Sequence, residues 1–409
     1  MLRGRTGTWA ILAATLVLAG GCPLLATGAA AGEMNSLSKE EIADGWILLF
    51  DGATTFGWEA VGGATWRVPV AGNGRADGAL ASEEGEGWIL TNTEFADFTL
   101  KAEFRVGDGG NSGICFRAAK GPKPYETGYE MQIGDHMRGE PTGSIEHVAA
   151  APPGARKASS WQSAVITAEG DHLTVVLDGK PLVDTHSPKY GRGVIGFQRG
   201  APQRKVEFRN VFLKPLGQKP IFNGKDLNGW QVLPGHKSVY SVAPAGELNV
   251  KDGNGEIQTE GQWADFCFQL DIISNGEHLN SGVFFRGIPG QFWTGYESQI
   301  RNQWEGEDRT KPVDFGTGAI YGHQPARRVV PSDREWFTKT IVAHGRHMAV
   351  WVNGYQVSDW TDPRPLHESP RQGCRLQAGV ITLQGHDPTT DLSFRNLRIV
   401  EYPKREPGN

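Results

Sequence analysis

Short runs of alternating apolar and polar residues recur along the chain, separated by turns rich in Gly, Asn, Asp and Pro. A period of two is typical of a half-buried β-strand, because successive side chains of an extended strand point to opposite faces. The runs at 174–182 and 348–355 turn at Asp178-Gly179 and Asn353-Gly354, which predicts two β-hairpins. Almost no segment has the period of a long amphipathic helix, so an all-β fold is expected.

An ordered set of short motifs occurs twice along the chain. Asn111–Arg117 (NSGICFR) and Gly128–Ile133 (GYEMQI) match Asn280–Arg286 (NSGVFFR) and Gly295–Ile300 (GYESQI). About seven such elements recur in the same order, which indicates a tandem duplication whose unit is a whole domain.

Each copy has the length of an ordinary domain, with copy one at 43–214 and copy two at 218–403. The linker at 215–219 is short, so we expect the two domains to touch. Short strands between tight turns predict two tandem antiparallel β-sandwiches of the jelly-roll type. The 55 glycines and 13 tryptophans among 409 residues fit turn-rich and aromatic-rich sheets. A net charge of -5 without a basic stripe argues against nucleic acid as a partner.

Residues 1–31 have the pattern of an export signal. Arg3 and Arg5 precede an apolar run at 9–19 that is too short to span a bilayer. Two cleavage outcomes stay open: a lipobox ending before Cys22, which would carry a membrane lipid anchor, and an alanine-rich site at 29–31. Both outcomes predict an exported protein, which is periplasmic, a cell-surface lipoprotein or secreted.

Three cysteines follow this leader, namely Cys115, Cys267 and Cys374. An odd number cannot all pair within one chain, and their spacing is not that of metal ligands. Cys115 and Cys267 stand in apolar runs, where cysteine behaves as a small buried hydrophobe. We therefore expect a fold that does not depend on disulfides.

The paired motifs predict a polar sheet face. Glu297 and Gln299 share one face of their strand, and Asn280, Phe284 and Arg286 share one face of the strand before it. If the two strands are neighbours with these sets aligned, the face carries a carboxylate, two amides and a guanidinium. The corresponding polar residues of copy one are Asn111, Arg117, Glu130 and Gln132.

The motif set resembles the family of 3-keto-disaccharide hydrolase domains, which are exported β-sandwich domains of the concanavalin A-like lectin/glucanase class. Further motifs that carry the resemblance lie at 49–58, 318–321 and 383–386, and the two copies cover almost all of the mature chain. The resemblance implies a carbohydrate-active role. Copy two fits the pattern better, because copy one has Phe197–Gly200, without a histidine, where copy two has Leu383–His386. We therefore expect copy one to be degenerate or to bind only.

The chemistry follows from which acids are present. An ordinary glycosidase needs two carboxyls, and glucanases of similar fold place them on alternate residues of one strand. The residue two after Glu297 is Gln299, so the sequence disfavours that mechanism. A 3-keto sugar needs only one base, because its C3 carbonyl acidifies the hydrogen on C2. Removal of that proton gives an enolate, which needs a cation or hydrogen-bond donors at its oxygen. The enolate then expels the group on C1 by elimination, and water adds to complete a net hydrolysis. We assign Glu297 as the base, Arg286 as the enolate stabiliser, and His386 or Tyr321 as the acid.

The remaining candidates are expected to bind substrate. In copy two these are Asn280, Gln299, His323, Gln384 and Trp293, and in copy one Asn111, Arg117, Glu130 and Gln132. A divalent metal held by Glu297, His323 and His386 stays open as a cofactor, although their spacing shows no metal motif. Arg286 as a structural salt-bridge residue also stays open. The alternative function is that of a non-catalytic, lectin-like glycan-binding protein, since the fold serves both roles.

Overall fold

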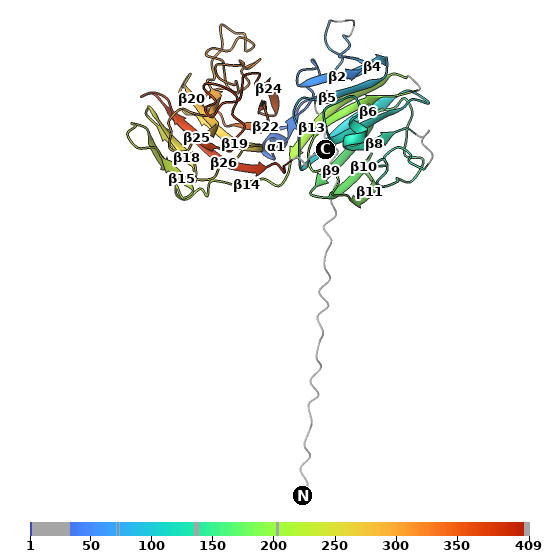
Figure 1. The fold of residues 1–409 in the computed structure, drawn as a ribbon, viewed down its shortest axis with the longest axis horizontal. Helices are drawn as coiled ribbons and strands as arrows, with labels where there is room; N and C mark the ends of the chain where they lie inside the picture. Colours follow the sequence, from blue (N-terminus) through green and yellow to red (C-terminus); the bar gives the residue numbers. More distant parts are fainter. Residues whose placement is uncertain (2–32, 71, 73, 135–138, 202–203, 405–409) are drawn as a thin grey trace. The chain divides into compact units, whose positions relative to one another are not determined.

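The computed structural model describes residues 33–404 apart from 71, 73, 135–138 and 202–203, together with Met1 (Figure 1). The export signal and Cys22 lie outside the described residues. Within the described residues, no helix has the length and apolar character needed to cross a membrane. Two short helices occur in the part of the chain that the structure describes, α1 (Lys39–Ala43) and α2 (Pro124–Thr127).

Copy one is a sandwich of two antiparallel sheets. The larger sheet has eight strands, ordered β11 (Lys180–His186), β10 (His172–Leu177), β9 (Gln162–Glu169), β6 (Phe98–Val106), β13 (Val206–Pro215), β4 (Leu80–Glu84) and β3 (Thr65–Arg67), with β1 (Ile47–Leu48) also paired to β13. The smaller sheet has five, ordered β2 (Trp58–Gly62), β5 (Gly87–Thr91), β12 (Val194–Arg199), β7 (Ser112–Ala118) and β8 (Tyr129–Ile133).

Copy two repeats this arrangement strand for strand. Its eight-stranded sheet is ordered β16 (Val239–Val242), β17 (Leu248–Lys251), β26 (Asp391–Glu401), β19 (Phe266–Ser274), β22 (Phe337–His344), β23 (His347–Val352) and β24 (Tyr355–Thr361), with β14 (Lys219–Pro220) paired to β26. Its five-stranded sheet is ordered β15 (Trp230–Val232), β18 (Gly255–Thr259), β25 (Val380–Gly385), β20 (Ser281–Gly287) and β21 (Tyr296–Ile300). The prediction of two tandem antiparallel sandwiches is confirmed.

Period-two burial builds each core, as the alternating pattern predicts. In β6 every second residue from Phe98 to Val106 is buried. Both predicted hairpins form, since Asp178 (φ 49°) and Gly179 (φ 78°), like Asn353 (φ 46°) and Gly354 (φ 75°), take the left-handed conformation that tight hairpin turns require.

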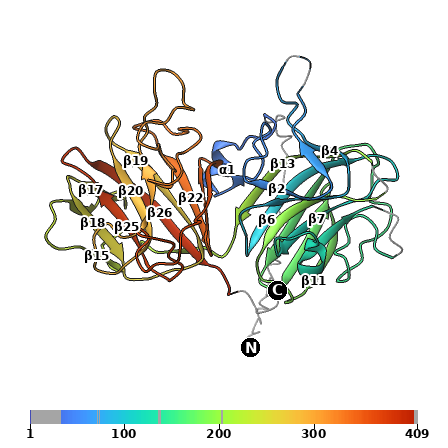
Figure 2. The same cartoon turned by 45° about the horizontal axis from the view of Figure 1, so that its top comes forward.

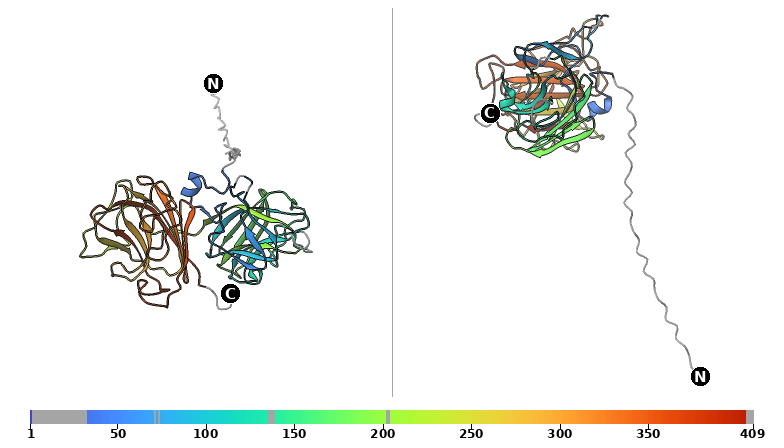
Figure 3. Two further views of the ribbon diagram at one scale, coloured as in Figure 1. Left: turned by 90° about the horizontal axis from the view of Figure 1, so that it is seen from above. Right: turned by 90° about the vertical axis from the view of Figure 1, so that its right-hand side faces the viewer.

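The two sandwiches contact each other, as the short linker predicts. Buried residues of copy two, including Cys267 and Trp351, belong to the hydrophobic cluster of copy one. The indole N–H of Trp351 donates to the carbonyl of Leu48 at 2.8 Å. Helix α1 and the segment after it lie between the sandwiches in Figures 2 and 3, and the carbonyl of Gly45 accepts from Gln269 of copy two at 2.9 Å.

Candidate functional site

Polar side chains cover the face of the five-stranded sheet of copy two that points away from the core. The opposite face carries core residues such as Ile257, Val283 and Leu383. Strand pairing aligns the polar positions across the sheet. Glu297 and Thr382 lie on either side of Phe284, and Glu256 lies opposite Gln384. We call this set the polar face; it consists of Glu256, Gln258, Asn280, Glu297, Gln299, Thr382 and Gln384.

Glu297 lies on β21, an edge strand of this sheet. It is 5% exposed, and a Cβ atom on Gly282, which lies diagonally across the β20–β21 pair, would lie 2.5 Å from its Oε1. The glycine of the Asn-Ser-Gly motif therefore leaves space for the carboxyl. Burial raises the pKa of Glu297 to about 8, partly offset by the guanidinium of Arg371, whose Nη2 is 3.6 Å from Oε2. Glu297 can thus take up and release a proton near neutral pH.

Lys339 lies on the core side of the strand that carries Glu297. It is fully buried on β22, and its Nζ donates to the carbonyls of Ser298 at 3.1 Å and Gln299 at 2.9 Å. Burial lowers the pKa of Lys339 to about 7, and Glu297 opposes that effect. The position in copy one that aligns with it by strand register is Ala164. The buried lysine is therefore specific to copy two.

Side-chain amides and an imidazole form a hydrogen-bond network at the edge of the polar face. Asn280 and Gln299 each donate a side-chain N–H to Asp314 Oδ2 at 3.1 Å. The Nε2 atom of His386 lies 3.3 Å from Asn280 Nδ2, and its Nδ1 lies 2.8 Å from Asp387 Oδ2. The structure thus brings together four predicted site residues, Glu297, Asn280, Gln299 and His386, through Asp314 and the sheet.

Tyr321 is tied to the same region through its backbone. Its N–H donates to the carbonyl of Glu297 at 2.9 Å. Burial raises the pKa of Tyr321, and the negative charges of Asp314 and Glu297 raise it further.

Several residues of the site were not predicted from the sequence, namely Glu256, Gln258, Asp314, Lys339, Arg371 and Thr382. Two of them, Arg371 and Glu256, both bond to the backbone of Trp293. Arg371 comes from the loop before β25 and donates from Nε to the carbonyl of Trp293 at 3.1 Å. Glu256, on β18, is 1% exposed and accepts from the backbone N–H of Trp293 at 3.2 Å. The period-two pattern of β18 could have placed Glu256 on a sheet face; nothing in the sequence tied either residue to Glu297.

Several polar atoms of this face have no hydrogen-bond partner within the described residues. They are Glu256 Oε1, Asn280 Oδ1, Thr382 Oγ1 and Gln384 Oε1. Buried polar atoms are nearly always paired, so a run of unpaired acceptors on one face fits a ligand that donates hydrogen bonds. The hydroxyls of a sugar supply such donors.

The prediction that Arg286 shares this face is wrong. A β-bulge between Phe284 and Gly287 and the left-handed φ of 53° at Arg286 turn the side chain off the expected side. Arg286 is 0% exposed, and its guanidinium donates to three backbone carbonyls and to Asp265 Oδ1 at 3.2 Å. Arg117 of copy one is held in the same way, by Asp97 at 2.6 Å. Both arginines are structural.

The predicted binding aromatic and the second histidine lie on loops. Trp293 is 46% exposed, and the guanidinium of Arg371 lies 5.1 Å from its ring centre. The ring of His323 stacks on Trp360 at 4.5 Å, and burial lowers the pKa of His323. In the described part of the chain, no group of three or more His, Cys, Asp and Glu residues is arranged to hold a metal ion. We therefore derive no step through the metal that the sequence left open.

Copy one keeps part of this face and has apolar side chains at other positions. Asn111, Gln198 and Glu130 retain unpaired atoms, and Gln132 retains its place on β8. Burial raises the pKa of Glu130 well above its usual range. Copy one also has a small hydrophobic cluster of Trp88, Leu90, Cys115, Ala118 and Val194. Two of its members, Trp88 and Leu90, stand by strand register where copy two has Glu256 and Gln258.

Comparison with known proteins agrees with the duplication. A family model described as the 3-keto-alpha-glucoside-1,2-lyase-like domain matches residues 45–214 and again 217–400. A 3-keto-disaccharide hydrolase of Bacteroides thetaiotaomicron is 36% identical over 95 residues, which are 22% of this chain and 32% of the relative. The chain thus covers about a third of that relative's length.

Solved structures give weaker similarities. A candidate glycosyl hydrolase of Parabacteroides distasonis is 25% identical and covers 45% of this chain and 100% of its own, with a TM-score of 0.39. A β-glucanase of Bacillus licheniformis is 14% identical, covers 46% of this chain and 99% of its own, and has a TM-score of 0.32.

The fold and the polar face define a tandem β-sandwich protein of a carbohydrate-active class. The chain belongs to the 3-keto-alpha-glucoside-1,2-lyase-like domain family, which its two copies match over most of their length.

Proposed function

We propose that copy two is an exported enzyme that cleaves 3-keto-glycosides by base-initiated elimination followed by hydration. The observation that carries the proposal is Glu297, a buried carboxyl with a pKa of about 8 on a face of unpaired hydrogen-bond acceptors. A base whose pKa lies near the working pH transfers protons most efficiently. The family match supports the choice of substrate.

In the first step, the carboxylate of Glu297 removes the C2 proton of the sugar, and the electron pair moves onto the C3 oxygen to form an enolate. The enolate then expels the glycosidic oxygen from C1, which leaves a double bond between C1 and C2. The departing oxygen takes a proton, for which His386 and Tyr321 are the candidates from the sequence. Addition of water across C1 and C2 completes a net hydrolysis.

Arg371 stabilises the enolate, the role that was predicted from the sequence for Arg286. Its guanidinium is 3.6 Å from Glu297, so it is the cation nearest the base on the polar face. A fixed positive charge beside the C3 oxygen would stabilise the enolate, and the side chain of Arg371 is 36% exposed and so is open to a bound sugar. Trp293, exposed at 46% beside this loop, is suited to stacking on a sugar ring.

The test is replacement of Glu297 by Gln, with Glu130→Gln in copy one as the matched control. We expect Glu297→Gln to lower release of the leaving sugar from a 3-keto-glucoside by at least about 100-fold, since general-base catalysis contributes that much or more. Glu130→Gln should keep nearly full activity. Retained turnover in Glu297→Gln would remove this residue from the mechanism.

The second candidate function is glycan binding without turnover. The exposed ring of Trp293 favours it, because an aromatic platform with nearby amides is enough to hold a sugar. Retention on polysaccharide columns without any product from 3-keto-disaccharides would support this function. Release of reducing sugar would support the enzyme.

A further inference from the structure

Glu256 faces Glu297 across the polar face. The order β18-β25-β20-β21 separates their strands by two others, which corresponds to about 14 Å between strand axes. Trp293 bridges this span: its N–H donates to Glu256 at 3.2 Å, and its carbonyl accepts from Arg371 at 3.1 Å. Arg371 in turn lies 3.6 Å from Glu297. Trp293 and the guanidinium of Arg371 therefore connect Glu256 with Glu297, which lie on opposite sides of the polar face.

The duplication provides an internal comparison for Glu256. It pairs with Gln384 in copy two, and Trp88 pairs with the corresponding Gln198 in copy one. Trp88 is 3% exposed and stacks on Tyr125 at 6.3 Å. A small apolar cluster thus occupies the place of the second acid in copy one. Both copies keep the first acid, as Glu130 and Glu297, so the second acid is one of the differences between them.

The surroundings of Glu256 let its carboxyl hold a proton up to about neutral pH. Its Oε1 atom has no hydrogen-bond partner in the described structure, and the backbone N–H of Trp293 is the donor to Oε2. Burial raises the pKa of Glu256 to about 7, and that N–H and the charge of Arg371 oppose the effect. The negative charge of Glu256 also raises the pKa of Glu297. Two interacting acids of this kind release their protons one after the other. Because the pKa of Glu297 is about 8 and that of Glu256 is about 7, the pairing that the reaction needs, with Glu256 protonated and Glu297 ionised, is the less populated of the two singly protonated forms near neutral pH.

We propose that Glu256 is the proton donor to the leaving group, and this inference rests on the function proposed above. While the C1–O bond of the enolate breaks, the O–H of the Glu256 carboxyl protonates the departing glycosidic oxygen. The resulting Glu256 carboxylate then takes a proton from the water that adds at C1. Glu297 returns its proton to C2, and both groups are restored without a further reactant.

The two candidates from the sequence are less suited to this step. Both ring nitrogens of His386 already face partners, Asp387 at 2.8 Å and Asn280 at 3.3 Å. The pKa of Tyr321 is raised above that of an ordinary phenol, which makes it a poorer proton donor at neutral pH. Glu256 has a free oxygen and lies inside the polar face.

The experiment compares two 3-keto-glucosides, one with a sugar as leaving group and one with p-nitrophenol, which needs no acid. For Glu256→Gln we expect at least about a 100-fold loss of turnover on the sugar substrate, the usual contribution of a general acid, and little loss on the nitrophenyl substrate. Glu260→Gln, an exposed residue just beyond the same strand, is the matched control and should turn over both.

A second readout separates proton donation from a structural effect. In D₂O, Glu256→Gln should still exchange the C2 hydrogen of the substrate for deuterium, because Glu297 still forms the enolate, whereas Glu297→Gln should not. Equal losses on both substrates, together with lost exchange in a Glu256→Gln variant that melts like the wild type, would overturn the role of Glu256. Wild-type protein that cleaves neither substrate would instead overturn the proposed function itself.

Discussion

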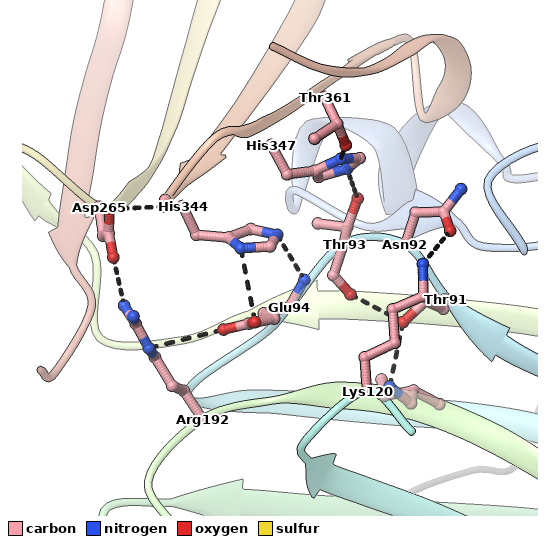
Figure 4. Close-up of polar contacts among 12 residues, drawn as sticks. Thr91, Asn92, Thr93, Glu94, Lys120, Arg192, Asp265, His344, His347 and Thr361 are labelled. Carbon is pink, nitrogen blue, oxygen red and sulfur yellow. Dashed lines mark hydrogen bonds and ion pairs between the residues drawn. The ribbon is translucent and has the colours of Figure 1, made fainter. Parts of the chain in front are cut away.

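The backbone N–H of Glu94 in copy one donates to the imidazole Nε2 of His344 in copy two at 3.0 Å (Figure 4). Beside it, His347 Nε2 lies 3.1 Å from the hydroxyl of Thr93. Arg192 completes the contact, with Nη1 2.7 Å from Asp265 of copy two. Asp265 also holds Arg286, so the domain contact is directly connected to the strand beside Glu297.

Replacing His344 by Ala should therefore lower stability. The change leaves the buried N–H of Glu94 without its acceptor, and an unsatisfied buried donor costs about 1–3 kcal/mol. Calorimetry should show a lower melting temperature for His344→Ala. His147→Ala, whose side chain is 82% exposed, is the control and should melt like the wild type. Identical melting of all three proteins would contradict a stabilising role for this contact.

The stability of the protein should depend on pH through Glu297. Its pKa is raised to about 8 from 4.5, so between these pH values the folded state binds more protons than the unfolded state. The free energy of unfolding therefore falls as pH rises through this range, by up to about 1.4 kcal/mol per pH unit from this group. Glu297→Gln lacks this loss, so its stability relative to the wild type should grow between pH 5 and pH 8.

Denaturant titrations at pH 5, 6.5 and 8 measure this difference. Glu307→Gln removes an exposed carboxyl from a loop of the same domain and serves as the control, with a stability that should stay within about 0.5 kcal/mol of the wild type. A stability difference for Glu297→Gln that stays constant from pH 5 to pH 8 would refute the raised pKa.

Removing the charge of Arg371 should shift the pH profile of the reaction. Its guanidinium lowers the pKa of both Glu297 and Glu256. In Arg371→Gln the pKa of the base rises further, so the carboxylate form becomes scarcer at pH 7 and the acidic limb of kcat/KM moves to higher pH. Arg334→Gln, at an exposed ion pair with Glu277, should leave the profile in place. An acidic limb that moves to lower pH would contradict the arrangement.

Arg286 provides a test of the corrected assignment. Arg286→Met removes a buried guanidinium that donates to three backbone carbonyls, and a buried polar group left without its partner costs about 1–3 kcal/mol. We expect Arg286→Met to destabilise copy two, and Arg117→Met, the equivalent change with Asp97, to destabilise copy one to a similar degree. A fully stable Arg286→Met protein with a large loss of kcat would restore Arg286 to the catalytic machinery.

The duplication, the strands and one side of the site could be predicted from the amino-acid sequence. Period-two alternation assigns Glu297 and Gln299 to one face of their strand, and this follows from the geometry of an extended chain alone. The Asp-Gly and Asn-Gly pairs determine their hairpins equally locally, because few residue pairs tolerate two left-handed conformations. These features depend on residues that are close together in the sequence, so they can be predicted from the sequence alone.

Which acids and cations meet depends on long-range packing and is visible only in the folded protein. Arg286 breaks the alternation because a β-bulge turns it away, and a bulge arises from pairing with another strand. Glu256 and Arg371 reach Glu297 only because β18 and the loop before β25 are brought to the same face by the order of the sheet. The raised pKa values likewise come from burial, which depends on long-range packing. Side chains that are far apart in the sequence come together in one site only when the strands have paired into the sheet.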